Sequence, residues 1–359
     1  MAKKRSHRME KLARIYDDEI LPVWGQPFAR MLLRGLVVPE RSQVLNVACG
    51  TGYVAVEIVR RMGRGSRLIA IDSSSTLLDV ARRKVEKLGT RDVFFRTESI
   101  GPRLSFADGV YDLLVCNLGL LEMEDIGRAL AEFARVVKPG GHVRCTIPLA
   151  GTYQEFYDIY REVLIKHDKH EILARLDEHL AGYATAADCE VWMNNAQLGD
   201  PRIEVEEFSM LFKSSREFFF APVVEYGPLP GWKELSGHGQ ELQDIFWYIK
   251  EAIDAYFSGR AFEVSVKGAC LIGLVQERSH SDIAAAGEHS RPEKLNGERP
   301  IAASLIESEE VSVSGQADGT REIDVAELEE IEEIDPDLDP DDIGLVFHDA
   351  SQMPEEEPT

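Results

Sequence analysis

The sequence predicts an α/β fold: a mostly parallel, seven-stranded sheet with helices on both faces and a helical cap. Two observations predict it. Between residues 40 and 150, short apolar runs rich in β-branched residues alternate with segments whose apolar residues recur at helical spacing, as in a parallel sheet with crossover helices. After residue 150 a long helical stretch replaces this rhythm, and two later extended segments provide the last two strands.

The elements of the sheet follow from periodicity. A helix is predicted over 7–35, because its apolar residues form one stripe at helical spacing. Strands are predicted at 44–47, 66–72, 92–96, 111–117 and 142–147, with helices at 54–62, 77–88 and 126–137 between them. Gly89 stands where a glycine often ends a helix. The "KPGG" run should end the third of these helices.

The second half of the chain should cap the sheet. Helices are predicted at 153–184 and 240–257, and strands at 202–212 and 262–275. Between them, the proline spacing of "REFFFAPVVEYGPLPGW" excludes a long regular helix. Its aromatic residues, including Phe219, are interpreted either as core packing or as one wall of an apolar acceptor pocket. In the second case the pocket would be closed by aromatic residues of the first helix, namely Tyr16, Trp24 and Phe28.

Charge divides the chain in two. The formal net charge of −23 belongs almost wholly to residues 278–359, where 24 Asp and Glu stand against 5 Lys and Arg. With Phe347 as its one Phe, Trp or Tyr residue, that segment cannot bury enough apolar surface to offset the entropy of ordering. We predict one globular domain at 1–277, with a ligand-binding core at about 36–150 and a substrate cap with the last strands at 151–277. A disordered acidic tail follows at 278–359.

One part of the tail has a pattern. In 323–334, apolar residues recur every three positions among acids, which predicts a short acidic helix, marginal alone. It could bind a protein partner or a basic patch of its own domain. The alternative is a solvating tail without a partner.

Composition excludes several classes of protein. The nearly neutral body argues against a nucleic-acid partner, which needs a basic face. No apolar run is long enough to span a membrane, and no signal peptide is evident. Five widely spaced cysteines suggest buried thiols in a reducing cytoplasm. His167 and His170 could form half a metal site but are more typical of a charged helix face, so no metal is predicted.

The stretch "VLNVACGTGYVAVE", from residue 44, predicts a ligand cradle of strand, tight turn and helix N-terminus. Gly50, Gly52 and Ala55 fit the G-x-G-x-x-G/A pattern, in which glycines allow positive φ and close approach of a ligand to the backbone. Asp72 ends the next strand, where a carboxylate can accept hydrogen bonds from ribose hydroxyls. This combination predicts an adenosine cofactor, and both a nicotinamide dinucleotide and S-adenosylmethionine fit it.

Two further observations favour S-adenosylmethionine. No lysine has a tyrosine four residues before it, so the Tyr-x-x-x-Lys relay common in short-chain hydride-transfer enzymes is absent. The segments "VLNVACGTG", "IAIDSSSTLLDVARRK", "LSFADGVYDLLVC" and "ALAEFARVVKPGGHVRCTIP" resemble, in order and spacing, the motifs of class I S-adenosylmethionine-dependent methyltransferases. Their more specific pieces resemble the group that holds the quinone C-methyltransferases and the malonyl-carrier-protein O-methyltransferases. The clear match covers about 40–150.

The resemblance implies a Rossmann-like fold and a set of cofactor-binding residues. Asn46 stands where the family has an acid for the methionine amine, and Ala48 where it has a loop glycine. The remaining candidates are Gly50 and Gly52 in the turn, Asp72 for the ribose with Ser73 beside it, Glu98 near the adenine amine, and Asn117 facing the methionine end.

The resemblance also limits the acceptor. The [DNS]-P-P-[FY] motif of exocyclic-amine methyltransferases is replaced by "NLGL" from Asn117, which argues against adenine or glutamine amines. Methyl transfer needs alignment more than it needs a catalytic triad, and no catalytic residue is predicted. The predicted function is methyl transfer to an oxygen or carbon of a small or carrier-protein-bound acceptor. The alternatives are a cofactor-binding regulatory or scaffold protein acting through its tail, and a nicotinamide-dependent oxidoreductase.

Overall fold

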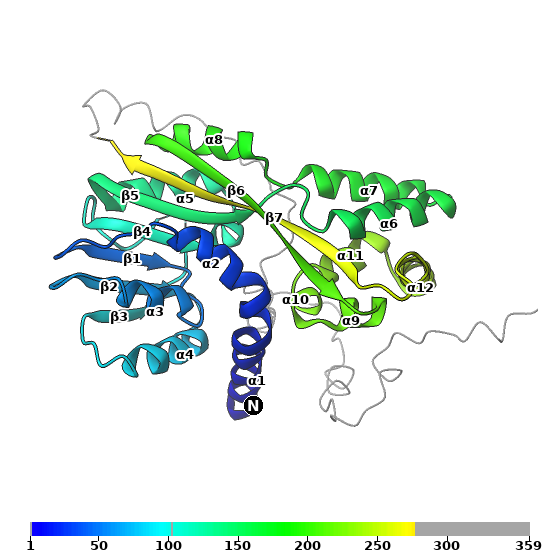
Figure 1. Ribbon diagram of the computed structural model, residues 1–359, viewed down its shortest axis with the longest axis horizontal. Helices are drawn as coiled ribbons and strands as arrows, with labels where there is room; N and C mark the ends of the chain where they lie inside the picture. Colours follow the sequence, from blue (N-terminus) through cyan, green and yellow to red (C-terminus); the bar gives the residue numbers. More distant parts are fainter. Residues whose placement is uncertain (1, 102, 277–359) are drawn as a thin grey trace, which may run out of the picture.

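The computed structural model describes residues 2–101 and 103–276 (Figure 1). The predictions of a disordered tail at 278–359 and of a partner-binding helix at 323–334 lie outside the described residues.

The described chain forms a seven-stranded sheet with the order β3-β2-β1-β4-β5-β7-β6. In this spatial order the strands are Val93–Thr97, Arg67–Asp72, Gln43–Val47, Tyr111–Asn117, Val137–Pro148, Phe262–Val275 and Leu198–Phe212. The pairs among β1 to β5 are parallel, whereas β7 runs antiparallel to both β5 and β6. The predicted mostly parallel sheet is confirmed. The strand order reverses between β1 and β4, the place where such sheets bind ligands.

Helices cover both faces of the sheet, as predicted. Val44 of β1 packs in one apolar cluster with the helices α2 (Gln26–Leu33) and α3 (Tyr53–Val59), on the face that α4 (Ser75–Glu86) also covers. The next residue, Leu45, packs in a second cluster with α5 (Ile126–Val136) and α8 (Ala186–Asn195). Successive strand residues point to opposite faces, so the unbroken apolar strands are buried on both sides.

The helical N-terminus is confirmed but is not one regular α-helix. Between α1 (Ala2–Ile15) and α2 the chain forms a π-helix, η1 (Tyr16–Gly25), which contains Pro22. Proline has no N–H to donate and interrupts the α-helical ladder. The Gln26 N–H, four residues further on, donates to the Leu21 carbonyl, five residues before it. Such wider turns are frequent at functional sites.

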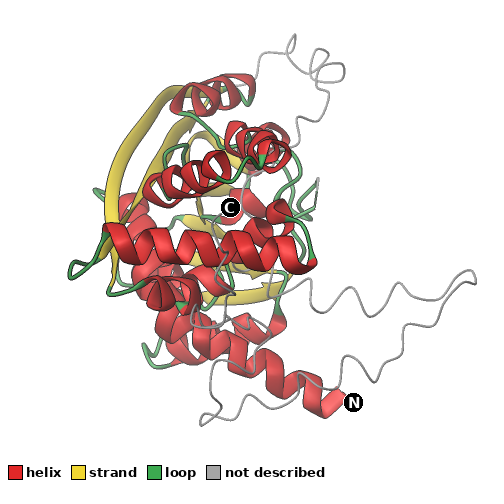
Figure 2. Ribbon diagram, turned by 90° about the vertical axis from the view of Figure 1, so that its right-hand side faces the viewer, coloured by secondary structure: helices red, strands yellow, loops and turns green. Residues whose placement is uncertain are grey.

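The helical cap consists of two separate insertions (Figure 1). The first, α6 (Gln154–Lys166) and α7 (His170–Ala181), follows β5. The second lies between β6 and β7 and contains α9 (Ser215–Phe220), α10 (Pro222–Glu225), α11 (Leu229–Ser236) and α12 (Gly239–Tyr256). As the proline spacing predicts, 215–236 forms short helices. From the cap side, these helices lie in front of the strands (Figure 2).

Two local features go beyond the predictions. Residues 186–195 form the helix α8, which was not predicted, although Thr185 and Asp188 make the reciprocal hydrogen bonds of a capping box. The "KPGG" run follows the end of α5, as predicted, and is itself part of β5. It bulges there, because Tyr111 pairs with Val137 whereas Leu113 pairs with His142.

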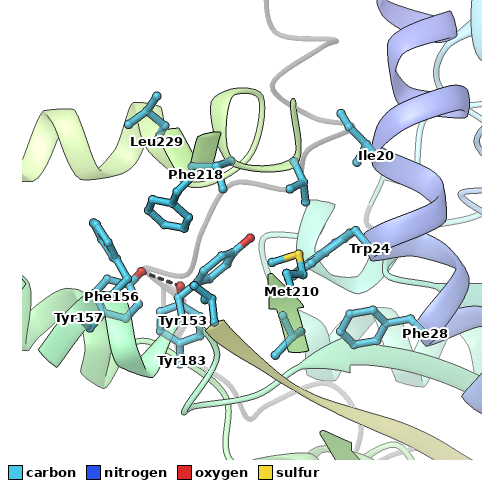
Figure 3. Close-up of a cluster of buried hydrophobic side chains, with 14 of the residues drawn as sticks. Ile20, Trp24, Phe28, Tyr153, Phe156, Tyr157, Tyr183, Met210, Phe218 and Leu229 are labelled. Carbon is cyan, nitrogen blue, oxygen red and sulfur yellow. Dashed lines mark hydrogen bonds between the residues drawn. The ribbon is translucent and has the colours of Figure 1, made fainter. Parts of the chain in front are cut away.

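An aromatic core joins the two insertions (Figure 3). The fully buried Trp232 stacks on Phe156 with ring centroids 3.9 Å apart and on Phe218 at 5.8 Å. Its Nε1 donates a hydrogen bond of 2.8 Å to the Tyr157 hydroxyl, which also lies 3.0 Å from the Tyr183 hydroxyl. Stacking and hydrogen bonding thus lock helices from distant parts of the chain together.

Candidate functional site

The glycine turn after β1 has the positive φ angles that the sequence predicts. Gly50 and Gly52 adopt positive φ angles of 52° and 83°, which side-chain-bearing residues rarely adopt. A Cβ on Gly52 would stand 2.6 Å from the Cβ of Ala81 in α4. Gly52 therefore lets two neighbouring helices approach closely, and it opens the N-terminus of α3.

Asp72 fastens this turn to the end of β2. Its Oδ2 accepts a hydrogen bond of 2.8 Å from the Gly50 N–H, and its Oδ1 accepts one of 2.9 Å from the Ser74 N–H. The side chain is buried, and burial raises its pKa while the two N–H donors lower it. A carboxylate has about four lone-pair positions, so Asp72 keeps acceptor capacity beyond these two bonds. Ser73 lies half-buried between Asp72 and the N-cap residue of α4.

Asn46 is fully buried in β1, and its amide is half satisfied. Its Nδ2 lies 3.3 Å from the Val47 carbonyl and 3.4 Å from the Val115 carbonyl. Its Oδ1 is buried and has no hydrogen-bond partner among the described residues. A buried acceptor without a donor is costly, so the position suits a ligand that donates a hydrogen bond.

Ala48 adopts a left-handed φ of 50° where the resemblance places a glycine. Its methyl group lies against Gly119, where an added Cβ would stand 2.4 Å from the Ala48 Cβ. The side chain missing at Gly119 thus makes room for the one present at Ala48. This complementary pair brings the turn after β4 into contact with the glycine turn.

Asn117, at the end of β4, has both ends of its side chain engaged. Its Nδ2 donates to the Gly25 carbonyl at 3.1 Å, and its Oδ1 accepts from the Thr146 hydroxyl at 2.9 Å. Thr146 in turn accepts from the Leu118 N–H at 3.0 Å. Asn117 therefore fastens the N-terminal segment to the sheet edge through one donor and one acceptor position of its amide.

The N-terminal segment covers the glycine turn. A Cβ on Gly50 would lie 3.8 Å from Cε1 of the Tyr16 ring. The next residue, Asp17, accepts a hydrogen bond of 2.6 Å from the Thr51 hydroxyl and forms an ion pair with Lys84 of α4. Burial, then the charges of Glu122, Asp72 and Asp17, raise the pKa of Tyr16 well above its ordinary value. The phenol is thus neutral and lies amid carboxylates.

The other predicted pocket residues, Trp24, Phe28 and Phe219, belong to one buried apolar cluster, against which Tyr16 also packs. Trp24 and Phe28 are buried where the N-terminal segment meets the cap, and Trp24 stacks on Tyr153 with centroids 6.0 Å apart (Figure 3). Phe219 is buried inside the cap, 5.5 Å between ring centroids from Phe246. These three contribute to the apolar core, whereas Tyr16 lies at the glycine turn.

Glu98 lies beside Asp72, and its carboxylate has partners of its own. Its N–H donates to the Asp72 carbonyl at 3.0 Å, which extends the pairing of β3 with β2 by one hydrogen bond. The carboxylate pairs with Arg96 and accepts from the Ser105 N–H at 2.9 Å.

Glu122 is the residue that the sequence analysis missed. It ends η2 (Gly119–Glu122), a short 3-10 helix that follows β4. Burial, and next the charge of Asp72, raise its pKa to about 8. No motif marks this position, although a glutamate three residues after Gly119, at the end of a predicted strand, could have drawn attention to it.

No described group of three or more His, Cys, Asp or Glu side chains could hold a metal ion. The His167 ring stacks on Tyr248 at 3.6 Å, and His170 is exposed on its helix. Among the described helices, none is long and apolar enough to cross a membrane.

A parallel sheet with a glycine turn at its switch point and a buried acid on the next strand defines the Rossmann-like class of nucleoside-cofactor enzymes. A family model described as "Methyltransferase domain" matches residues 44–141. The demethylmenaquinone methyltransferase of Bacteroides fragilis is 31% identical over 176 residues, which cover 45% of this chain and 70% of that protein.

The ubiquinone/menaquinone biosynthesis C-methyltransferase of Pectobacterium carotovorum is 29% identical over 150 residues, 41% of this chain and 57% of that one. Among solved structures, the YcgJ protein of Bacillus subtilis aligns with a TM-score of 0.46 and 14% identity over 70% of this chain and 99% of its own. The chain belongs to the S-adenosylmethionine-dependent methyltransferases. The resemblance read from its motifs is confirmed, and its cofactor is S-adenosylmethionine rather than a nicotinamide dinucleotide.

Proposed function

We propose that the residues at the edge of β1, β2 and β4 hold the cofactor, with Asp72 on the ribose and Asn46 on the methionine amine. The observation that supports this placement is the unpaired Oδ1 of Asn46, a buried acceptor that the amine would satisfy. Asp72 retains acceptor capacity for hydroxyl groups, and Gly50 has no side chain of its own between the backbone of the turn and the Tyr16 ring that covers it. When bound, S-adenosylmethionine provides an activated methyl group.

We further propose that the acceptor is a small or carrier-bound molecule with an apolar body, methylated at carbon or oxygen. Tyr16 lies over the turn, and Trp24 and Tyr153 line the junction between N-terminal segment and cap. Apolar and aromatic surfaces of this kind select apolar ligands. The two relatives described above are named for quinone methylation, and a reduced quinone ring carries both a nucleophilic carbon and hydroxyl groups. The nearly neutral body speaks against a nucleic acid as acceptor.

The chain's own contribution to the reaction would be alignment. Asp17, Lys84 and Asn117 hold the N-terminal segment against the sheet edge, which excludes water from the turn. Orientation of two reactants can lower a barrier by roughly 7–11 kcal/mol. A general base is required only where the acceptor is not already ionised.

Replacing Asp72 tests the cofactor placement. We expect the wild-type protein to bind S-adenosylmethionine and S-adenosylhomocysteine with micromolar affinity in calorimetry, and not to bind NADH. Asp72→Ala should weaken binding of both sulfur compounds by roughly 1.5–3 kcal/mol, the scale for hydrogen bonds to a charged group. Asp79→Ala, which removes an exposed carboxylate in the adjoining α4, should leave affinity unchanged. Unchanged binding by a folded Asp72→Ala variant would exclude Asp72 as the ribose acid.

The acceptor class is tested with a labelled methyl group. Protein is incubated with methyl-tritiated S-adenosylmethionine and one acceptor at a time: a reduced naphthoquinone with a prenyl side chain, a carrier-linked dicarboxylic acyl group, or transfer RNA. We expect label in one of the first two, and mass spectrometry then distinguishes methyl on carbon from methyl on oxygen. Transfer of label to RNA alone would contradict the proposal.

A further inference from the structure

The Glu122 carboxyl differs from the other acids near the glycine turn because no group among residues 2–101 and 103–276 is hydrogen-bonded or ion-paired to it. Its side chain is half-buried at the end of η2. By contrast, Asp17 is paired with Thr51 and Lys84, and Asp72 accepts from two N–H groups. A carboxyl that no described group engages is available to a ligand, which suggests a role in binding.

Its position is set by contacts on both sides of the cradle. The first residue of η2, Gly119, packs on Ala48 of the glycine turn. Among charged groups, Glu122 has the largest electrostatic effect on Tyr16, whose ring covers Gly50. Glu122 therefore lies at the same edge as the cofactor-binding turn and within electrostatic reach of what that turn holds.

The carboxylates of Asp72 and Asp17 at the glycine turn are engaged by protein donors, and β1 itself contributes no charge. Asn46, which stands where the family has an acid, offers a neutral amide oxygen. S-Adenosylmethionine carries a permanent positive charge on its sulfonium, whereas S-adenosylhomocysteine, left after methyl transfer, has a neutral thioether. The two compounds are otherwise alike in ribose, adenine, amine and carboxylate, so a group that senses the sulfonium charge distinguishes substrate from product.

We propose that Glu122 provides the carboxylate that recognises the sulfonium charge, so that the site prefers S-adenosylmethionine to S-adenosylhomocysteine. This inference rests on the cofactor placement proposed above. In this proposal the turn after β4 provides the negative charge that the neutral Asn46 in β1 does not provide.

The proposal links cofactor binding to a proton. In the free protein the pKa of Glu122 is about 8, raised by burial and then by Asp72, so at pH 7 the carboxyl is mostly protonated. A cation nearby favours the ionised form and lowers the pKa by roughly 1–3 units. Binding of S-adenosylmethionine at pH 7 should therefore release close to one proton. Its affinity should rise from about pH 6 to pH 8, the interval between the two pKa values.

Besides burial, the charge that acts on Glu122 is that of Asp72, whose carboxylate accepts from the Gly50 and Ser74 N–H groups. In η1, burial and then the charge of Glu122 raise the pKa of Tyr16 well above its ordinary value, so this phenol stays neutral over the pH range of the test. Substituting Glu122 while Asp72 and Tyr16 remain in place separates the titration of Glu122 from that of these neighbours.

The test compares Glu122→Gln with Glu124→Gln, a matched change at an exposed position two residues further along. Calorimetry with S-adenosylmethionine and with S-adenosylhomocysteine is performed between pH 6 and 9, in buffers of different ionisation enthalpy so that released protons are counted. At pH 8 we expect Glu122→Gln to weaken binding of S-adenosylmethionine at least ~10-fold and to change binding of S-adenosylhomocysteine less than about twofold. Proton release should disappear. Glu124→Gln should behave as wild type.

Other results are equally decisive. Equal weakening of both compounds by Glu122→Gln, or a wild-type affinity for S-adenosylmethionine that does not change with pH, would overturn the role of Glu122 and leave the cofactor placement intact. If wild-type protein bound neither compound, the cofactor placement itself would fail. Thermal unfolding of each variant establishes that a change in affinity does not reflect loss of the fold.

Discussion

Gly52→Ala is expected to destabilise the protein by roughly 2–5 kcal/mol and to abolish cofactor binding at micromolar concentrations. Two costs add. A residue with a Cβ is strained by about 1–2 kcal/mol in the left-handed region, where Gly52 has a φ of 83°. The new methyl group would also overlap Ala81, 2.6 Å away at its Cβ, and overpacking costs about 1–3 kcal/mol. If α4 moved to relieve this overlap, it would also displace Asp72, because the N-cap residue of α4, Ser74, follows Asp72 by two positions.

The control is Gly89→Ala. Gly89 also has a left-handed φ, 68°, but no atom lies within 4 Å of the place that a Cβ would occupy. It therefore measures the strain alone, and about 1–2 kcal/mol is expected. Urea unfolding of both variants separates strain from overlap. Adding Ala81→Gly to Gly52→Ala should recover part of the loss, with a coupling energy above about 0.5 kcal/mol. Equal destabilisation by the two alanine substitutions would contradict a role for close helix packing.

Trp232→Ala should destabilise the protein by roughly 3–5 kcal/mol, the range for removal of a buried large aromatic residue. The indole is fully buried, stacks on Phe156 and Phe218, and donates to Tyr157. Its loss leaves a cavity where the two cap insertions meet. Trp232→Phe should cost less, since it keeps an aromatic ring, and the Tyr157 hydroxyl retains Tyr183 and His179 as partners.

Trp247→Ala is the matched control, because Trp247 is only half-buried on α12. We expect a loss of about 1 kcal/mol or less, as is usual for positions away from the packed core. Chemical denaturation followed by circular dichroism measures all three variants. A loss at Trp247 as large as at Trp232 would show that the aromatic core of Figure 3 is not what joins the insertions.

Much of the cofactor half could be predicted because its signals are local. Alternation of buried strands and amphipathic helices identifies each element within a window of a few residues. The run from Val44 to Gly52 encodes both a strand and the turn after it, since glycine at positive φ is a property of single residues. Parallel strands place their carboxyl ends at one edge. Gly50 and Asp72 could therefore be brought together before any contact was known.

Other parts of the site depend on residues that no short window contains. The amide of Asn117 bonds to Gly25 and Thr146, neither of which is near it in the sequence. The raised pKa of Glu122 comes from burial in the folded chain and then from Asp72, which is far away in the sequence. The π-helix η1 was missed because its apolar stripe resembles that of an α-helix.

The sequence by itself determined the class of fold, the glycine turn and the methyltransferase family, since each is written in local periodicity or in a short motif. Only the tertiary structure decided that β7 lies antiparallel between β5 and β6, that two separate insertions form one cap, and that the carboxyl of Glu122 lies near the glycine turn without a partner among the described residues. The physical reason is distance along the chain. Phe156 and Trp232 meet because burying both rings lowers the free energy of the whole assembly, and nothing in the neighbourhood of either residue specifies the other.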